Sequence, residues 1–279
     1  MATLPTILMH SNQPEPQPAP AAEVPFSTRE VLGVPVAMVD YERAIAVMDQ
    51  LIERDLRGYV CAAPVHALMV AQDDPEMLAA LRGSTMVVPD GMPVVWAANL
   101  LGEQLHDRVY GPELMLRYSA HSAERGHRVW LYGGRDQGSL VQLALSLRRD
   151  HPGIQVVGGY SPPFRPLGAD EEDSIARQIN EARPDVLWVG IGVPKQEKWM
   201  ARMRDRLDVP VMCGVGAAFD FHAGRVSMAP GWMQERGLEW IYRTLQEPRR
   251  LLGRYLSTNP RFVAAFARQY LAERRRRRG

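Results

Sequence analysis

The sequence lacks several features that would assign it to common classes of protein. It has no run of about 18 apolar residues and no charged amino terminus followed by an apolar segment, so we expect neither a membrane-spanning helix nor a signal peptide. Its only cysteines, Cys61 and Cys213, lie in apolar, strand-like runs and form no CxxC spacing. We therefore expect reduced thiols in a core, as is typical of a cytosolic protein.

Ligand-binding patterns of two common kinds are also missing. The seven histidines show no pairing of the kind that holds a metal, so no metal site is expected. The turn at Gly133-Gly134, which follows an apolar run ending in Tyr132, would suit a phosphate. It is nevertheless only part of the GxGxxG fingerprint of dinucleotide-binding domains, so by itself it is weak evidence.

Basic residues are distributed unevenly along the chain. Residues 236–279 contain twelve arginines, no lysine and three glutamates, which gives a net charge of +9. Because the whole chain has a net charge of +1, the preceding 235 residues carry −8. A basic tail on an acidic body is typical of a protein with an anionic partner, either a lipid surface or a nucleic acid.

Short apolar runs alternate with amphipathic segments along most of the chain. We expect strands at 34–39, 59–62, 85–88, 128–132, 154–158, 186–189 and 209–213, and helices at 41–56, 66–81, 92–101, 112–125, 138–149, 170–182 and 195–206. This alternation is typical of an α/β fold, so we predict a Rossmann-like layered domain with a mostly parallel sheet.

The two ends of the chain differ in composition from this central part. Residues 1–25 include six prolines and little apolar periodicity, and we expect a disordered leader there. Residues 26–227 are then the α/β domain, and residues 228–279 an Arg-rich helical appendage. In the appendage we expect short helices at 237–245, 248–255 and 260–275, broken by Pro248 and Pro260. A helical subdomain with a solvated basic face is the simpler alternative.

The segment from Asp185 to Asp220 carries the clearest indication of a ligand site. One apolar strand runs into Gly190-Ile191-Gly192, and the next ends in Gly214-Val215-Gly216, shortly before Asp220. If the two strands are neighbours, their ends place glycines and polar groups on one rim of the sheet, where ligands bind in open parallel sheets. The helix between them begins with Lys195 and Gln196, and its free amides would suit a phosphate. Two tight turns without a ligand remain the alternative.

These residues also form longer motifs that resemble a known family. The runs GxGxPKQExWM, GVGAAFDFxAG and APxWMQxxGLEWxYR, together with VVPDGMPVVWA and RVYGPELM upstream, are similar to those of the WecG/TagA/CpsF glycosyltransferases. The resemblance covers roughly residues 31–262. It implies transfer of a sugar from a UDP-sugar donor to a polyprenyl-diphosphate-linked acceptor, with inversion, during synthesis of a cell-surface polysaccharide. The protein would then work at the cytosolic face of the membrane.

The resemblance also implies roles for individual residues. Asp90, in the PDG motif, matches the family's proposed catalytic base, although a lone aspartate after a strand is more often a helix N-cap. Arg108 matches an active-site arginine. The nucleotide-sugar site would include Gln196 and Asp220, beside the glycine-rich strand ends. The expected residues at those ends are Tyr132, Gly133, Gly190 and Gly192, and the expected arginines over the diphosphate or acceptor are Arg243, Arg250 and Arg254.

Two features qualify the expected chemistry. No two aspartates have the DxD spacing with which many glycosyltransferases hold a metal, so we expect a metal-independent reaction in which cations and backbone amides stabilise the leaving diphosphate. Where the family usually carries Thr-x-Asn, this chain has Ala62-Ala63-Pro64, with His66 nearby. The change removes a hydroxyl and an amide that could contact the donor sugar, so N-acetylmannosamine is not assured as that sugar.

Two alternatives of other classes remain at the level of sequence. An NAD-dependent sugar-nucleotide oxidoreductase would also show α/β alternation, but the missing GxGxxG counts against it. A non-catalytic protein that binds an anionic surface would explain the basic tail and would tolerate replacement of Asp90. We expect an anionic membrane surface rather than a nucleic acid as the partner of the tail, and the sequence does not specify an oligomeric state.

Overall fold

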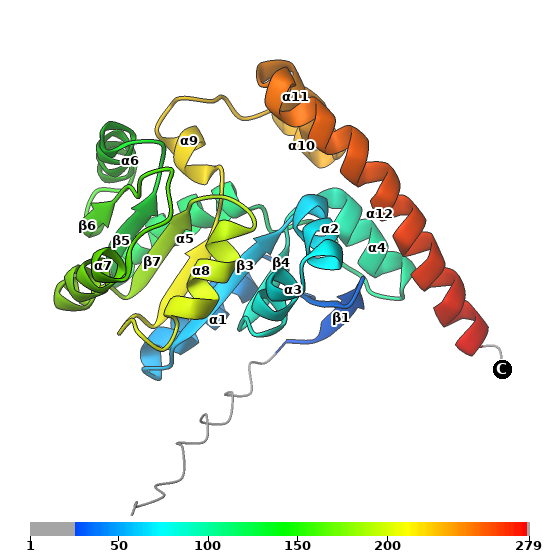
Figure 1. Cartoon of the computed structure of the whole chain (residues 1–279), viewed down its shortest axis with the longest axis horizontal. Helices are drawn as coiled ribbons and strands as arrows, with labels where there is room; N and C mark the ends of the chain where they lie inside the picture. The colour runs from blue at the N-terminus through cyan, green and yellow to red at the C-terminus, as the bar shows by residue number, and fades with distance from the viewer. Residues whose placement is uncertain (1–25, 278–279) are drawn as a thin grey trace, which may run out of the picture.

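The computed structural model describes residues 26–277, apart from the side chains of Gln234, Glu235 and Arg250. The expected leader and the last two residues lie outside this range. Eight strands occur within the described residues and form one sheet in the order β1-β2-β4-β3-β8-β7-β5-β6 (Figure 1). The strands are β1 (Thr28–Val31), β2 (Val34–Ala37), β3 (Gly58–Ala63), β4 (Met86–Pro89), β5 (Arg128–Gly133), β6 (Gln155–Tyr160), β7 (Val186–Gly190) and β8 (Val211–Gly214).

The sheet is parallel except for the hairpin of β1 and β2. Helices cover both of its faces, so the predicted α/β layered fold is confirmed. The helices are α1 (Tyr41–Glu53), α2 (Val65–Asp73), α3 (Pro75–Arg82), α4 (Met92–Leu100), α5 (Gly111–Arg125), α6 (Gln137–Asp150), α7 (Ala169–Ala182), α8 (Lys195–Met203), α9 (Ala218–His222), α10 (Gly231–Glu235), α11 (Glu239–Gln246) and α12 (Pro248–Arg276).

The core consists of two apolar layers, one on each face of the sheet. Alternate residues of a strand enter opposite layers: in β7, Leu187 packs with α7 and α8, whereas Trp188 packs with α1, α5 and α6. Because both faces are covered, the central strands are buried along most of their length and read as continuous apolar runs. Cys61 and Cys213 lie in these strands as buried, unbridged thiols, as predicted.

The helix expected at 66–81 is two helices. Asp74 precedes Pro75 and has extended backbone angles (φ −130°, ψ 100°), which the residue before a proline favours. Its carboxylate then accepts hydrogen bonds from the backbone amides of Glu76 and Met77, both at 3.1 Å, and so begins α3. The apolar periodicity continued across this break, which explains why the sequence pattern predicted one helix.

The expected break at Pro260 is wrong, because α12 runs without interruption through it. Pro260 lacks a backbone N–H group to donate within the helix, and its side chain is exposed. The helix is held on both sides of the proline by buried contacts, through Leu251 before it and through Phe262 and Phe266 after it. Tertiary packing therefore outweighs the lost backbone hydrogen bond.

The strand β1 was not expected from the sequence, because its polar residues show little apolar alternation. It pairs with β2 through a tight turn at Leu32 and Gly33, both with positive φ. The far end of α12 supports this turn, since Gln269 accepts a hydrogen bond from the Leu32 amide at 2.8 Å and donates one to the Glu30 carbonyl at 2.8 Å. The appendage thus runs along one side of the body and contacts the edge strand β1 (Figure 1).

Candidate active site at the carboxyl edge of the sheet

A cavity of about 930 Å³ opens at the carboxyl ends of β3, β4, β5, β7 and β8. Its lining from the body includes Ala62, Asp90, Tyr132, Gly190 and Val215, one from each of these strands or the residues just after them. Helices α11 and α12 of the appendage also contribute to the lining. This edge of an open parallel sheet is where ligands bind, so the cavity is the candidate site.

The glycines at the strand ends have two different functions in the structure. Gly133 and Gly190 are paired across β5 and β7, and a β-carbon on Gly133 would lie 2.5 Å from the Gly190 carbonyl oxygen. A β-carbon on Gly190 would lie 2.3 Å from the ring of Phe219. These two positions need glycine for close packing. Gly192 has a φ of +83° and no atom within 4 Å of an added β-carbon, so it gives a ligand access to the backbone.

Helix α8 begins at the cavity with two side chains of contrasting exposure. Lys195 is exposed, whereas Gln196 is 1% exposed. The side-chain oxygen of Gln196 accepts a hydrogen bond from the Gly216 amide at 3.1 Å, and its amide donates to Glu197 at 2.9 Å. Gln196 is therefore a buried side chain that holds the turn after β8 in place through its hydrogen bond with Gly216. The carboxylate of Glu197 is fully buried, and burial raises its pKa to about 7.

Asp90 follows β4 and borders the cavity, but it does not cap the helix that follows it. Residue Gly91 is the N-cap of α4, and no side chain caps that helix. The Asp90 carboxylate instead accepts a hydrogen bond from the Gly111 amide, at the start of α5. Burial raises the pKa of Asp90 to about 7, against the lowering effect of Arg108. A carboxylate with a pKa near neutral is suited to accept a proton from a hydroxyl.

Arg108 lies beside Asp90 and forms a buried ion pair with Glu239. Its Nη2 is 2.7 Å from Oε2 of Glu239, which belongs to α11, and each side chain is 9% exposed. The guanidinium also stacks over the ring of Tyr110 at 4.3 Å, and the Tyr110 hydroxyl donates a hydrogen bond to Glu239. Burial would lower the pKa of Arg108, but the Glu239 carboxylate raises it, so the cation is fully charged. The appendage therefore contributes a carboxylate to the centre of the site.

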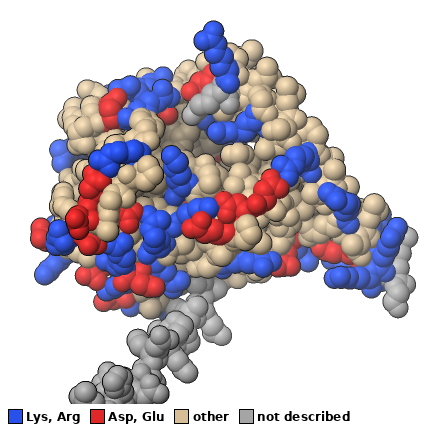
Figure 2. Space-filling view, viewed as in Figure 1, with Lys and Arg blue, Asp and Glu red and all other residues tan. Residues whose placement is uncertain are grey.

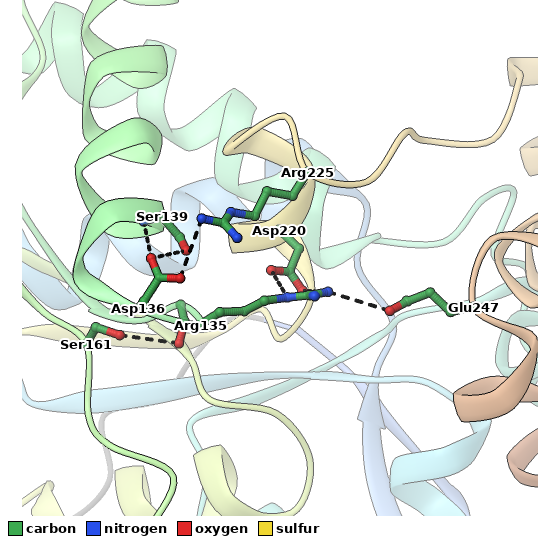
Figure 3. Close-up of polar contacts among 8 residues, drawn as sticks. Arg135, Asp136, Ser139, Ser161, Asp220, Arg225 and Glu247 are labelled. Carbon is green, nitrogen blue, oxygen red and sulfur yellow. Dashed lines mark hydrogen bonds and ion pairs between the residues drawn. The ribbon is translucent and has the colours of Figure 1, made fainter.

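A second ion-pair group joins the β5–α6 turn to the appendage (Figure 3). Arg135 follows the Gly133-Gly134 turn and contacts Asp220 through two hydrogen bonds, from Nε at 2.9 Å and from Nη2 at 3.2 Å. Its Nη2 is also 3.5 Å from Glu247, the residue before α12. Asp220, a predicted nucleotide-binding residue, thus lies in the cavity wall with its carboxylate oriented by Arg135.

Of the three predicted appendage arginines, Arg243 and Arg254 line the cavity. The Arg243 guanidinium lies 5.2 Å from the centre of the Phe221 ring. The side chain of Arg250 lies outside the described residues. On the face seen in Figure 2, acidic and basic side chains alternate around the body, and basic ones gather at the carboxyl end of α12.

The wall formed by Ala62 and Pro64 has no hydrogen-bonding side chain until His66, which also lines the cavity. Burial, with a smaller contribution from Arg254, lowers the pKa of His66 to about 4. The imidazole is therefore neutral at neutral pH and offers one nitrogen as a donor and the other as an acceptor. This wall therefore offers fewer hydrogen-bonding side chains than one that carries a hydroxyl and an amide.

The structure thus brings all the predicted residues with described side chains to one cavity or its immediate wall. Sequence reasoning missed Tyr110, Arg135, Glu239 and Glu247. Tyr110 and Glu239 stand inside the motifs RVYGPELM and GLEW, but no spacing rule relates residues so far apart in the chain. Within residues 26–277, no group of three or more His, Cys, Asp or Glu side chains is placed to hold a metal. No helix in the same range is long and apolar enough to cross a membrane.

The fold and the site define an α/β enzyme whose ligand cavity lies at the carboxyl edge of a parallel sheet. The chain belongs to the glycosyl transferase WecG/TagA/CpsF family, since the model of that family matches residues 29–276. It is a glycosyltransferase, so this prediction is confirmed and the oxidoreductase and non-catalytic alternatives are not supported.

Two similar proteins come from species of Bacillus, and both are named N-acetylglucosaminyldiphosphoundecaprenol N-acetyl-beta-D-mannosaminyltransferase. The protein of Bacillus spizizenii (strain ATCC 23059 / NRRL B-14472 / W23) is 29% identical over 214 residues, which cover 77% of this chain and 80% of the relative. The protein of Bacillus subtilis (strain 168) is 27% identical over 197 residues, which cover 71% of this chain and 75% of the relative.

Proposed function

We propose that this glycosyltransferase moves a hexose-type sugar from a UDP-sugar to a sugar linked to polyprenyl diphosphate, with inversion at the anomeric carbon. The single observation that carries the proposal is Asp90, a carboxylate at the cavity with its pKa raised to about 7 by burial and with cations around it. The names of the two relatives support a lipid-linked acceptor.

In the proposed reaction, Asp90 takes the proton of the acceptor hydroxyl while that oxygen attacks the anomeric carbon of the donor. The bond from this carbon to the diphosphate oxygen breaks, and the electron pair leaves with UDP. Arg243, Arg254 and the exposed Lys195 are placed at the cavity to stabilise the negative charge of the diphosphate. Asp220 accepts from a ribose hydroxyl in this arrangement, and the reaction needs no metal.

We assign the membrane surface as the place of reaction, because the acceptor is a lipid. The exposed apolar side chains Leu252, Leu256 and Val263 of α12, together with the basic residues at its carboxyl end, support contact of the appendage with an anionic cytosolic leaflet. The wall formed by Ala62 and Pro64 lacks a side-chain hydroxyl and amide that could contact an N-acetylmannosamine donor, so other donor sugars are tested beside it.

A donor panel tests the proposal. The purified chain is incubated with a short-chain polyprenyl-diphosphate N-acetylglucosamine acceptor and, in separate reactions, with UDP-linked glucose, N-acetylglucosamine, N-acetylmannosamine and glucuronic acid. Each reaction is run with and without a chelator. We expect transfer from at least one donor, unchanged by the chelator, and an inverted product. Absence of transfer from every donor, or loss of transfer with the chelator, contradicts the proposed reaction or its independence of metal.

A further inference from the structure

The carboxylate of Glu239 has an unusual position for a residue of the appendage. Its side chain is buried, with Oε2 at 2.7 Å from Arg108 and a hydrogen bond accepted from the Tyr110 hydroxyl. Both partners belong to the segment between β4 and α5, which also contains Asp90. A buried ion pair whose partners come from two parts of the fold forms only when those parts are docked together.

We propose that Glu239 is a positioning residue for the base: seated on the body with α11, it pairs with the Arg108 guanidinium beside Asp90 and so sets how strongly that cation acts on the Asp90 carboxylate. The inference rests on the proposed function, in which Asp90 takes the proton of the acceptor. It adds a role for a residue that does not itself contact the reacting atoms. Arg108 alone would hold Asp90 ionised and weakly basic, because an adjacent cation favours the charged form of a carboxylate.

The groups that face Asp90 come from several elements. They are Arg108, Tyr110 and the Gly111 amide from the segment that leads into α5, Glu239 and Arg243 from α11, Tyr255 from α12 and Tyr41 from α1. Apart from burial, Arg108 and Arg243 lower the pKa of Asp90 and Glu239 raises it. The tyrosines are neutral at neutral pH, since the pKa of each is raised. Without the charge of Glu239, its raising effect on the pKa of Asp90 is lost, and the lowering effects of Arg108 and Arg243 remain.

The substitution Glu239→Gln tests this role, because it removes the charge and retains an oxygen that can accept the hydrogen bond from Tyr110. The titration of Asp90 is followed by carbon-13 NMR of its carboxyl group, in the full chain without substrates. We expect the midpoint to fall by about one pH unit in Glu239→Gln. The matched control is Glu273→Gln, which removes a carboxylate of α12 whose described partner is Gln269. The control should leave the midpoint unchanged.

Two further variants separate charge from packing. Tyr110→Phe removes the hydroxyl bond but keeps the charge of Glu239, so the midpoint should remain near that of the unmodified chain. The double variant Arg108→Gln with Glu239→Gln removes both charges and leaves neither buried ion without its partner, so it tests the proposal even if Glu239→Gln alone does not fold. Its midpoint should lie near the wild-type value. If the titration midpoint of Asp90 falls as far in the double variant as in Glu239→Gln, the proposal is overturned.

Kinetics provide the functional readout. With the donor and acceptor that support transfer, the acid limb of the pH profile of kcat for Glu239→Gln should move about one pH unit lower, and the plateau should fall because the base is weaker. Binding of UDP should be unchanged. An unaltered NMR midpoint overturns the role of Glu239, even if transfer proceeds as proposed. Because the titration needs no turnover, a chain that transfers no sugar refutes the proposed function and leaves the NMR result to decide this inference.

Discussion

The surroundings of Asp90 have opposing effects on its pKa. Burial favours the neutral carboxyl and raises its pKa, whereas Arg108 and the Gly111 amide favour the carboxylate. The result is a pKa of about 7. A carboxylate with its usual pKa would be ionised at neutral pH but a poor acceptor of a hydroxyl proton. The balance therefore gives a group that is both substantially ionised and more basic than an exposed aspartate.

Replacement of Asp90 by Asn should lower kcat by about 10²–10⁴-fold, because the amide keeps the shape and cannot accept the proton. UDP affinity, measured by calorimetry, should change little. In the unmodified chain, kcat should rise with pH through about 7, as Asp90 loses its proton. The matched control is Asp150→Asn, an exposed carboxylate on α6 that pairs with Arg149. Retention of most activity in Asp90→Asn contradicts the role of the base.

The same pKa makes a prediction for stability. Folded Asp90 binds its proton more tightly than the unfolded chain does, since its pKa is raised from 3.8 to about 7. Through this group, the free energy of unfolding should therefore fall as the pH rises from about 4 to 7. Asp90→Asn should remove this contribution. Glu197 contributes in the same direction, because burial raises its pKa to about 7, whereas His66 contributes in the opposite direction, because its pKa is lowered to about 4. Urea unfolding at several pH values measures the effect, and equal slopes for Asp90→Asn and the unmodified chain contradict it.

Position 190 requires glycine because a larger residue would collide with a neighbouring side chain, and not because of its backbone angles. An added β-carbon would lie 2.3 Å from the buried ring of Phe219, so Gly190→Ala should destabilise the fold by about 1–3 kcal/mol. Gly253→Ala is the control, because nothing lies within 4 Å of its β-carbon and it lies in α12. That change should be neutral or stabilise by up to about 1 kcal/mol. Urea unfolding compares the two, and equal midpoints refute the packing argument.

At the scale of elements, local patterns predicted most of the fold. The apolar runs of β3, β4, β5, β7 and β8 were visible because strands buried on both faces need apolar residues throughout. Two features were not predictable from such patterns: strand β1 is polar and depends on pairing with β2, and the continuity of α12 depends on packing of residues on either side of Pro260. The break before α3 follows a local signal, Pro75, but the apolar periodicity that continues across it predicted one helix.

Arg135 links three elements and allows a prediction at this scale. It joins the turn after β5 to Asp220 of α9 and to Glu247 before α12. Because these groups are partly exposed, Arg135→Ala should change stability by less than about 1 kcal/mol. If Arg135 orients Asp220 for the nucleotide, UDP affinity should fall about tenfold, the effect of losing one charge-assisted hydrogen bond.

Calorimetry with UDP measures the affinity of this variant. Arg149→Ala is the matched control, because Arg149 forms an exposed ion pair with Asp150 away from the cavity lining. It should leave UDP affinity unchanged. Glu247→Gln should have a smaller effect than Arg135→Ala, since it leaves the two hydrogen bonds between Arg135 and Asp220 in place. Wild-type affinity in Arg135→Ala would rule out this orienting role.

At the scale of the whole molecule, the sequence predicted the location of the site better than it predicted the contacts between its charged residues. Glycine-rich strand ends located the edge of the sheet, and the family motifs identified Asp90 and Arg108. The ion pair of Arg108 with Glu239 was not predictable, because the two residues are far apart in the chain and meet only after the appendage folds back over the body. The environment that sets the pKa of Asp90 is therefore a property of the complete fold.

The arrangement of the appendage leads to a prediction about membrane contact. Arg274, Arg275 and Arg276 are exposed at the end of α12, whereas Arg277 donates a hydrogen bond to the Leu101 carbonyl at 3.1 Å. A surface arginine contributes about 1 kcal/mol to binding an anionic leaflet. Replacing the three exposed arginines by Gln should therefore weaken binding to vesicles rich in phosphatidylglycerol on the order of a hundredfold at low salt. The difference should shrink as salt is added.

Transfer to a soluble, short-chain acceptor separates this contact from catalysis. The triple variant should keep that activity, because residues 274–276 do not line the cavity, whereas Arg243→Gln and Arg254→Gln should lower it. Replacing Arg54, Arg149 and Arg177, which are exposed on other helices or at their ends, removes the same charge and controls for overall electrostatics. That control should weaken vesicle binding much less. Equal losses in the two triple variants would mean that net charge, and not the end of α12, governs membrane contact. Loss of soluble transfer in the Arg274–Arg276 variant would instead place these arginines in the catalytic function.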